Sequence, residues 1–140
     1  AARLRGNQIT LMTSLAEELP PVMGDRIELQ QVLLNLIANA IDAMERVPPE
    51  SRRIDISSAS TSDQFVQVTI TDQGTGLHGV DMERMFTLSY TTKDAGTGVG
   101  LSVSRSIVEA HGGKLWAEQN PGRGATFCFT VPAYSSAAVA

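Results

Sequence analysis

The pattern of apolar and polar residues changes its period several times along the chain, which is typical of mixed helix and strand structure. Strand composition or strict alternation predicts five strands. They are residues 8–15, 53–58, 65–72, 114–119 and 125–132. A longer period predicts a helix over residues 26–47, with Asp25 as its N-cap and Pro48 after its end. A second helix is expected to begin at Gly100 and to stop at Gly112.

These elements predict a single domain of the α+β class. We expect a two-layer sandwich in which a mixed sheet of about five strands is covered on one face by the helices. Segments 53–58 and 65–72 are separated by a short polar turn and should pair as an antiparallel hairpin, as should the last two strands. Residues 1–7 are interpreted as the remnant of an upstream helix or linker, and residues 133–140 as a flexible tail.

Composition narrows the classes of function. The 140 residues carry 11 basic and 15 acidic side chains, so a net charge of −4 gives no basic excess and no nucleic-acid partner is expected. No apolar run reaches the length of a membrane span, and no membrane contact by this domain is expected. The single cysteine, Cys128, lies in an alternating segment and is interpreted as a buried apolar residue, which fits a cytoplasmic domain of a soluble or membrane-tethered protein.

The first predicted helix carries a polar stripe on an apolar background. Between residues 32 and 44 every position is apolar except Asn35, Asn39 and Asp42, whose spacing places them on one face. A buried amide without a hydrogen-bond partner costs about 1–3 kcal/mol, so these side chains need partners. The helix alone does not decide whether the partners are protein groups or a ligand.

Two glycine-rich motifs follow the stripe. Asp72 ends the core-facing row of residues 65–72, and Gly74 and Gly76 after it allow a ligand to approach the backbone closely. The run GTGVGL, residues 96–101, opens onto the second helix, where backbone N–H groups and the helix dipole favour phosphate. The first motif is also an ordinary turn pattern, and the second lacks the Lys-Ser or Lys-Thr of a P-loop. The irregular segment 73–98 is interpreted as a functional loop.

Taken in order, these features resemble the ATP-binding catalytic domain of two-component sensor histidine kinases, in the superfamily shared with gyrase, Hsp90 and MutL. They are Asn-x-x-x-Asn, then D-x-G-x-G, then a phenylalanine and T-T-K, then G-x-G-x-G-L, then a final G-x-G before a strand. Residues 86–115 are especially similar to the kinase pattern, and the resemblance runs from about Thr10 to Pro132. It implies the Bergerat-type ATP-binding fold, with ATP and Mg²⁺ as ligands.

The resemblance also implies roles for individual residues. Asn39 supplies an oxygen to Mg²⁺, Asn35 supports the same metal and the phosphates as a metal ligand and catalytic residue, and Asp72 accepts a hydrogen bond from the adenine amino group. Lys93 is the second implied catalytic residue, at a terminal phosphate oxygen, with a solvated charge as the alternative. The remaining implied nucleotide-binding residues are Gly74, Gly76, Phe86, Tyr90, Thr92, Gly96, Thr97, Gly98, Val99, Gly100 and Leu101. Both aromatic residues in this set also fit an ordinary place in the core.

Three features depart from the family pattern. Asp42 stands where many sensor kinases have a basic or aromatic residue, so contact with metal-bound water and a solvated edge of the stripe both stay open. Ala125 follows the last G-x-G, where the family often has a hydroxyl, and by alternation Thr126 points to the other face. Neither His78 nor His111 has the H-E-x-x-x-P context of a phosphoacceptor.

The resemblance implies that the domain donates the γ-phosphate of Mg-ATP to a histidine on a separate helical dimerisation and phosphoacceptor domain of the same or the partner chain. A response regulator is expected downstream. In the superfamily ATPases a glutamate one helical turn before the metal asparagine activates water, and Asn35 at that position is a poor general base, which favours a kinase. The alternatives are a superfamily ATPase, a non-catalytic nucleotide-binding interaction module, and a rarer kinase of protein serine.

Overall fold

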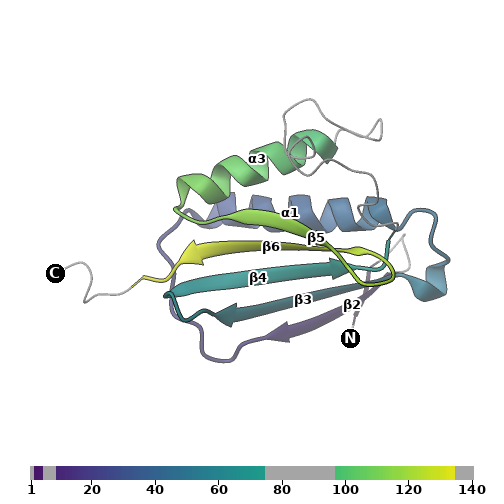
Figure 1. Cartoon of the computed structure of the whole chain (residues 1–140), viewed down its shortest axis with the longest axis horizontal. Helices are drawn as coiled ribbons and strands as arrows, with labels where there is room; N and C mark the ends of the chain where they lie inside the picture. The colour runs from purple at the N-terminus through teal and green to yellow at the C-terminus, as the bar shows by residue number, and fades with distance from the viewer. Residues whose placement is uncertain (1, 5–8, 75–96, 135–140) are drawn as a thin grey trace.

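The computed structural model describes residues 2–4, 9–74 and 97–134, and for residues 2–4 and 97–99 it describes the backbone only. The described elements form two layers, a sheet and two long helices packed on one of its faces (Figure 1). The strands are β1 (Ala2–Leu4), β2 (Ile9–Leu15), β3 (Arg53–Ser60), β4 (Phe65–Asp72), β5 (Leu115–Gln119) and β6 (Ala125–Pro132). The helices are α1 (Arg26–Ala43) and α3 (Thr97–Ala110), with a short 3₁₀ turn, η1 (Pro49–Ser51). Within the described ranges, neither helix is long and apolar enough to cross a membrane.

The sheet is mixed and has the strand order β1-β2-β3-β4-β6-β5. Only β2 and β3 run parallel among the paired strands described, and α1 makes the crossover that a parallel pair requires. The hairpin of β3 and β4 and the hairpin of β5 and β6 are both antiparallel, as predicted. The expected α+β sandwich with helices on one face is therefore confirmed.

The N-terminal residues differ from the expectation. Ala2–Leu4 form a strand instead of helix, with Ala2 opposite Leu11 and Leu4 opposite Ile9. The physical reason is that β2 would otherwise present unpaired backbone groups at the edge of the sheet, and antiparallel pairing with β1 satisfies them. Residues 1–7 are interpreted from the sequence as the remnant of an upstream helix or linker, and within them the structure describes Ala2–Leu4 as a strand. The described sheet therefore has one strand more than the five expected.

The core lies between α1 and the sheet. Along α1 and at its C-cap residue the buried side chains recur every four residues, and each is at most 2% exposed. They are Val32, Leu36, Ala40 and Met44. Burying a side chain the size of Leu36 stabilises the fold by about 1.5–3 kcal/mol, so this row fixes the rotation of α1 on the sheet. The same rotation turns the polar stripe away from the sheet. Cys128 is 4% exposed, which confirms it as a buried residue, and its Sγ lies 3.7 Å from Thr69 Oγ1 on the outer face of the sheet.

The first helix ends at Ala43 and not at residue 47 as predicted. Val47 precedes Pro48, which disfavours helical backbone at that residue, so the chain leaves α1 through tight turns instead. The Arg52 guanidinium then donates to the carbonyl oxygens of Val47 at 2.8 Å and Glu45 at 3.1 Å. These contacts satisfy two carbonyl groups of the turns that follow α1.

The second helix begins at Thr97 and not at Gly100, so Gly98 and Gly100 both lie in its first turn. Its end is as predicted. Gly112 adopts a φ of +87°, and its N–H donates to the Glu109 carbonyl oxygen at 3.0 Å. The next N–H, of Gly113, donates to Val108 at 3.0 Å, which completes a Schellman motif.

The expected boundary of the C-terminal tail at residue 133 is too early. The Ala133 N–H donates to the Gln64 carbonyl oxygen at 2.9 Å, and Ala133 forms a bridge with Val22. The Tyr134 N–H donates to the Pro21 carbonyl oxygen at 2.7 Å. Backbone hydrogen bonds therefore hold both residues against the segment that leads into α1.

Candidate functional site

One face of α1 connects the two glycine motifs. Asn35, Asn39 and Ala43 follow one another along this face at a spacing of four residues. At one end Asn35 contacts Gly100 in the first turn of α3. At the other end Gly74 packs on Ala43 so closely that a Cβ on Gly74 would lie 2.5 Å from the Ala43 carbonyl oxygen. Asn39 therefore lies between the two motifs.

Asn35 is held by protein groups. Its Nδ2 donates to the Gly100 carbonyl oxygen at 3.2 Å and to Ser104 Oγ at 3.1 Å, and its Oδ1 accepts from Gln31 Nε2 at 2.8 Å. A carbonyl oxygen can only accept, so the orientation of the Asn35 amide is fixed. The described contacts make Asn35 a link between α1 and α3. Its expected role at the metal stays a prediction.

Asn39 differs from Asn35 in its contacts. Its side chain is half-buried, and among the residues that the structure describes none forms a hydrogen bond with its amide. An amide oxygen is a ligand that suits Mg²⁺, which usually keeps several waters beside one or two protein oxygens. Of the two asparagines, the chemistry and the contacts of Asn39 fit the implied metal better.

Asp72 lies where the sequence predicts, at the end of the core-facing row of β4, and is 1% exposed. Its Oδ1 accepts from the Gly74 N–H at 2.8 Å and from the Ala125 N–H at 3.2 Å. Its Oδ2 has no partner among the described residues. Burial raises the pKa of the Asp72 carboxyl, and the two backbone hydrogen bonds oppose this shift without cancelling it. One oxygen is thus held by two backbone N–H groups, and the expected contact of Asp72 with adenine stays a prediction.

The turn between β5 and β6 contacts the backbone carbonyl group of Asp72. Gly124 has a φ of +87°, and a Cβ there would collide with the Asp72 carbonyl group. Asn120 Nδ2 donates to that carbonyl oxygen at 3.3 Å, and Thr126 Oγ1 donates to Asn120 Oδ1 at 2.5 Å. The sequence marks this turn by its G-x-G motif. It did not reveal Asn120 or the Ala125 N–H, because contacts between distant segments leave no local pattern.

The side chains of Thr126 and Leu101 lie on the outer face of the sheet and in the core, respectively. Thr126 Oγ1 lies 3.2 Å from Thr71 Oγ1 on the outer face of the sheet, while Ala125 is buried, so the predicted alternation is confirmed. The Leu101 side chain is 4% exposed and belongs to the core. A nucleotide contact by Leu101 would therefore come from its backbone.

Several predicted residues lie outside the described part of the chain. They are Gly76, His78, Phe86, Tyr90, Thr92, Lys93 and Gly96. Thr97, Gly98 and Val99 are described by their backbone, which forms the first turn of α3. The roles implied for all of them stay predictions.

Asp42 and His111 have surroundings of their own. Asp42 is half-buried and lines a cavity of about 150 Å³ together with Ile9, Ile41, Glu45 and Arg52. His111 follows the end of α3 as expected, and its Nε2 accepts from the Asp25 N–H at 3.0 Å. Its Nδ1 therefore carries the proton and donates to the Ile107 carbonyl oxygen at 2.8 Å. Both ring nitrogens of His111 are committed to the backbone.

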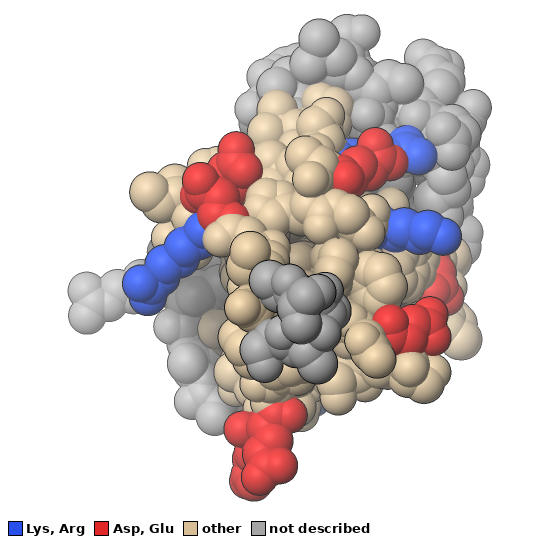
Figure 2. All heavy atoms as spheres, turned by 90° about the vertical axis from the view of Figure 1, so that its left-hand side faces the viewer, with Lys and Arg blue, Asp and Glu red and all other residues tan. Residues whose placement is uncertain are grey.

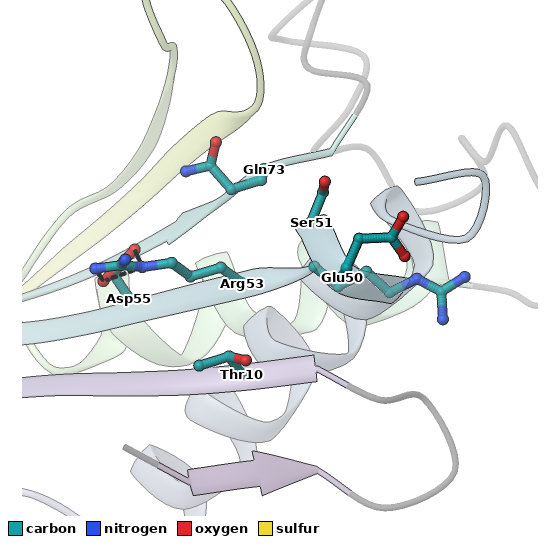
Figure 3. Close-up of a pocket in the computed structure, with 7 residues that line it drawn as sticks. Thr10, Glu50, Ser51, Arg53, Asp55 and Gln73 are labelled. Carbon is teal, nitrogen blue, oxygen red and sulfur yellow. Dashed lines mark hydrogen bonds and ion pairs between the residues drawn. The ribbon is translucent and has the colours of Figure 1, made fainter. Parts of the chain in front are cut away.

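A larger polar hollow of about 610 Å³ lies on the outer face of the sheet (Figure 3). Thr10, Arg53, Asp55 and Gln73 contribute to its lining. The Arg53 guanidinium lies 2.8 Å from the Asp55 carboxylate, and this partner raises the pKa of Arg53. Because Arg53 and Asp55 flank the buried Ile54, they point away from α1. This hollow is separate from the face of α1 that carries the asparagines.

Charged side chains are dispersed at the end of the molecule that Figure 2 shows. Acidic and basic groups alternate there among uncharged ones. With a net charge of −4 over the chain, an anionic ligand has to be held by local groups. The first turn of α3 offers such groups, since its backbone N–H donors have no partners within the helix.

Comparison with known proteins assigns the chain to a family. Residues 24–135 match the family described as histidine kinase-, DNA gyrase B-, and HSP90-like ATPase. The chain belongs to this family. This chain is 42% identical over 132 residues to the sensor protein FixL of Bradyrhizobium diazoefficiens. It is 39% identical over 132 residues to the adaptive-response sensory kinase SasA of a Synechococcus species.

Solved structures agree with this membership. The catalytic domain of the histidine kinase ThkA has a TM-score of 0.79 and 35% identity, covering 92% of this chain and 82% of that one. Full-length ShkA in complex with AMPPNP has a TM-score of 0.78 and 25% identity, covering 93% of this chain and 27% of that one. This chain is therefore an ATP-binding catalytic domain of the sensor histidine kinase type.

The domain corresponds to only a part of its longer relatives. The match with FixL covers 94% of this chain and 26% of FixL, and the match with SasA covers 91% of this chain and 33% of that protein. The other parts of these relatives lie outside the matched regions.

Proposed function

We propose that this domain binds Mg-ATP along α1 and donates the γ-phosphoryl group to a histidine on a separate helical phosphoacceptor domain. The observation that carries this proposal is the single face of α1 that touches Gly100 at one end and Gly74 at the other. Asn39 lies between these contacts without a described partner. The complex of ShkA with AMPPNP supports a nucleotide as the ligand.

The two glycine motifs would bind opposite ends of the nucleotide, the adenine base and the phosphates. Asp72 Oδ2 would accept a hydrogen bond from the adenine amino group, while Oδ1 is held by Gly74 and Ala125. The N–H groups in the first turn of α3 would hold the phosphates, aided by the helix dipole. Asn39 would hold the Mg²⁺, which neutralises phosphate charge when bound. Lys93 would contact a terminal phosphate oxygen.

The chemistry of transfer needs little more than positioning from this chain. The acceptor imidazole nitrogen forms a bond to the γ-phosphorus as the bond from that phosphorus to the β–γ bridging oxygen breaks. ADP leaves with the electron pair of the broken bond. We propose that α1, α3 and Asp72 hold the triphosphate in an extended conformation and in a fixed position relative to the acceptor histidine.

Asn35 favours transfer over hydrolysis. The superfamily ATPases have a glutamate at this position, whereas the Asn35 side chain is neutral and poorly suited to take a proton from water. Its amide is already bonded to Gly100, Ser104 and Gln31. We therefore infer slow ATP hydrolysis by the isolated domain.

The same proposal covers the wider context. We place the domain in the cytoplasm, next to a phosphoacceptor domain of the same or the partner chain, with a response regulator as the downstream receiver of the phosphoryl group. The likeness to named sensor kinases such as FixL and SasA supports this context.

Phosphotransfer can be tested by mixing the domain with isolated phosphoacceptor domains from its relatives and γ-labelled ATP. We expect label that is acid-labile and base-stable on the acceptor, and none when the acceptor histidine is replaced by glutamine. The measurement is autoradiography of the separated proteins. Fast hydrolysis by the domain alone, lost in Asn35→Ala, would identify an ATPase instead. ATP binding without transfer to any acceptor would favour the binding module.

A further inference from the structure

Ser104 is a polar side chain with no exposed surface, on the side of α3 that faces α1. Its Oγ lies 3.1 Å from Asn35 Nδ2, and among the described residues this is its one side-chain partner. We propose that Ser104 is a positioning residue for the nucleotide phosphates, because it acts through Asn35 to set the first turn of α3 against α1. The inference rests on the proposed nucleotide site.

The attachment has two points. Gly100 and Ser104 are four residues apart and so lie one above the other on the same face of α3. Each receives one N–H of the Asn35 amide, Gly100 at its carbonyl oxygen and Ser104 at its hydroxyl. A single hydrogen bond would allow α3 to pivot about it. Two bonds from one planar amide fix both the height and the rotation of the helix.

The attachment lies at the end of α3 that carries the glycines. A Cβ on Gly100 would lie 3.5 Å from Asn35 Cγ, so the two helices are in direct van der Waals contact there. At the other end of α3, His111 accepts from the Asp25 N–H at 3.0 Å and ties the helix to the start of α1. Loss of the Ser104 contact should therefore loosen the glycine end while the His111 end stays in place.

The glycine end determines where phosphate can bind. The N–H groups of the first turn of α3 have no partners within the helix and move with Gly100, whereas Asn39 is fixed one turn from Asn35 on α1. A phosphate chain that contacts both helices requires their register. The adenine end depends on Asp72, Gly74 and Ala125, none of which is bonded to Ser104. A positioning role therefore predicts a selective loss of phosphate affinity.

The experiment compares ATP, ADP and adenosine as ligands of the 140-residue chain and its Ser104→Ala variant, by calorimetry with Mg²⁺. We expect the Kd for ATP to rise about tenfold, which corresponds to ~1.4 kcal/mol. The rise should be smaller for ADP and absent for adenosine. Ser104→Thr, which keeps the hydroxyl, should restore much of the ATP affinity. Ser106→Ala, at an exposed position on the same helix, is the matched control and should bind as wild type does.

Asn35→Asp provides a second test, since it places a carboxylate oxygen against the Gly100 carbonyl oxygen and should give the same selective loss. An equal loss for ATP and adenosine in Ser104→Ala would show a merely structural role, and an unchanged Kd for ATP would show no role. Either result would overturn the inference. Failure of the wild-type chain to bind ATP at all would instead refute the proposed function.

Discussion

Replacing Asp72 with asparagine is expected to weaken ATP binding by about 100-fold, because a hydrogen-bond donor then replaces the acceptor that faces the adenine amino group in a buried site. Asparagine keeps an oxygen for the N–H groups of Gly74 and Ala125. Its NH₂ group then occupies the place of Oδ2 and faces the adenine amino group, which is also a donor. Calorimetric titration of Asp72→Asn with Mg-ATP measures the loss.

The same substitution is expected to leave the unfolding temperature at pH 7 unchanged or to raise it. Burial raises the folded-state pKa of Asp72 above its ordinary value of 3.8, so the native state binds this proton more readily than the unfolded chain does. The resulting stabilisation is complete below the ordinary value and is lost as pH rises through the raised one. At any pH above the raised pKa the ionised carboxylate therefore costs stability, and Asp72→Asn removes that cost.

Protonation of Asp72 should also make ATP binding pH-dependent. Affinity is expected to fall as pH falls through the raised pKa of this carboxyl, and the fall should be missing in Asp72→Asn. Asp55→Asn is the matched control, since it removes an equal charge from the neighbouring strand, in an exposed ion pair with Arg53. Full ATP affinity in Asp72→Asn would show that the adenine pocket lies elsewhere.

Truncating Asn39 to alanine is expected to remove the part of ATP affinity that depends on magnesium. Asn39 is the asparagine of the stripe with no described partner, so its loss should disturb few protein contacts. We expect the Kd measured with Mg²⁺ to rise about 10- to 100-fold, the range usual for weakened metal sites. The Kd measured in EDTA should match that of the wild type, because EDTA removes the metal ion that Asn39 would bind.

Gln30→Ala is the matched control for this experiment. It truncates an exposed amide on the same helix, and binding with and without metal should be unaltered. If Asn39→Ala weakened binding equally in Mg²⁺ and in EDTA, the side chain would contact the nucleotide directly. The assignment of Asn39 as a metal ligand would then be wrong.

The features that follow from local periodicity could be predicted from the sequence. Alternation along residues 65–72 placed Asp72 at the end of the core-facing row, and the helical period placed Asn35 and Asn39 on one face. The Gly112 stop required only the left-handed backbone that glycine accepts. These properties are set within a few residues of each position.

The features that depend on distant segments could not be predicted. The stripe did not reveal that Asn35 binds protein, because Ser104 is 69 residues away in sequence. Asn120 supports Asp72 across 48 residues, and the end of α1 depends on the Arg52 guanidinium. Pairing of Ala2–Leu4 with β2 likewise depends on which edge of the sheet is available. Tertiary contacts decide such details after the local pattern has set the elements.

The most direct test of the nucleotide site is a titration of the isotope-labelled domain with Mg-ATP, followed by NMR chemical shifts. Shifts are expected for the Asn39 side-chain amide, for the Gly74 and Ala125 amides beside Asp72, and for the first turn of α3. Residues of the outer hollow, such as Thr10 and Arg53, should stay unchanged. Shifts gathered at that hollow, or none at α1, would contradict the placement of ATP between the two glycine motifs.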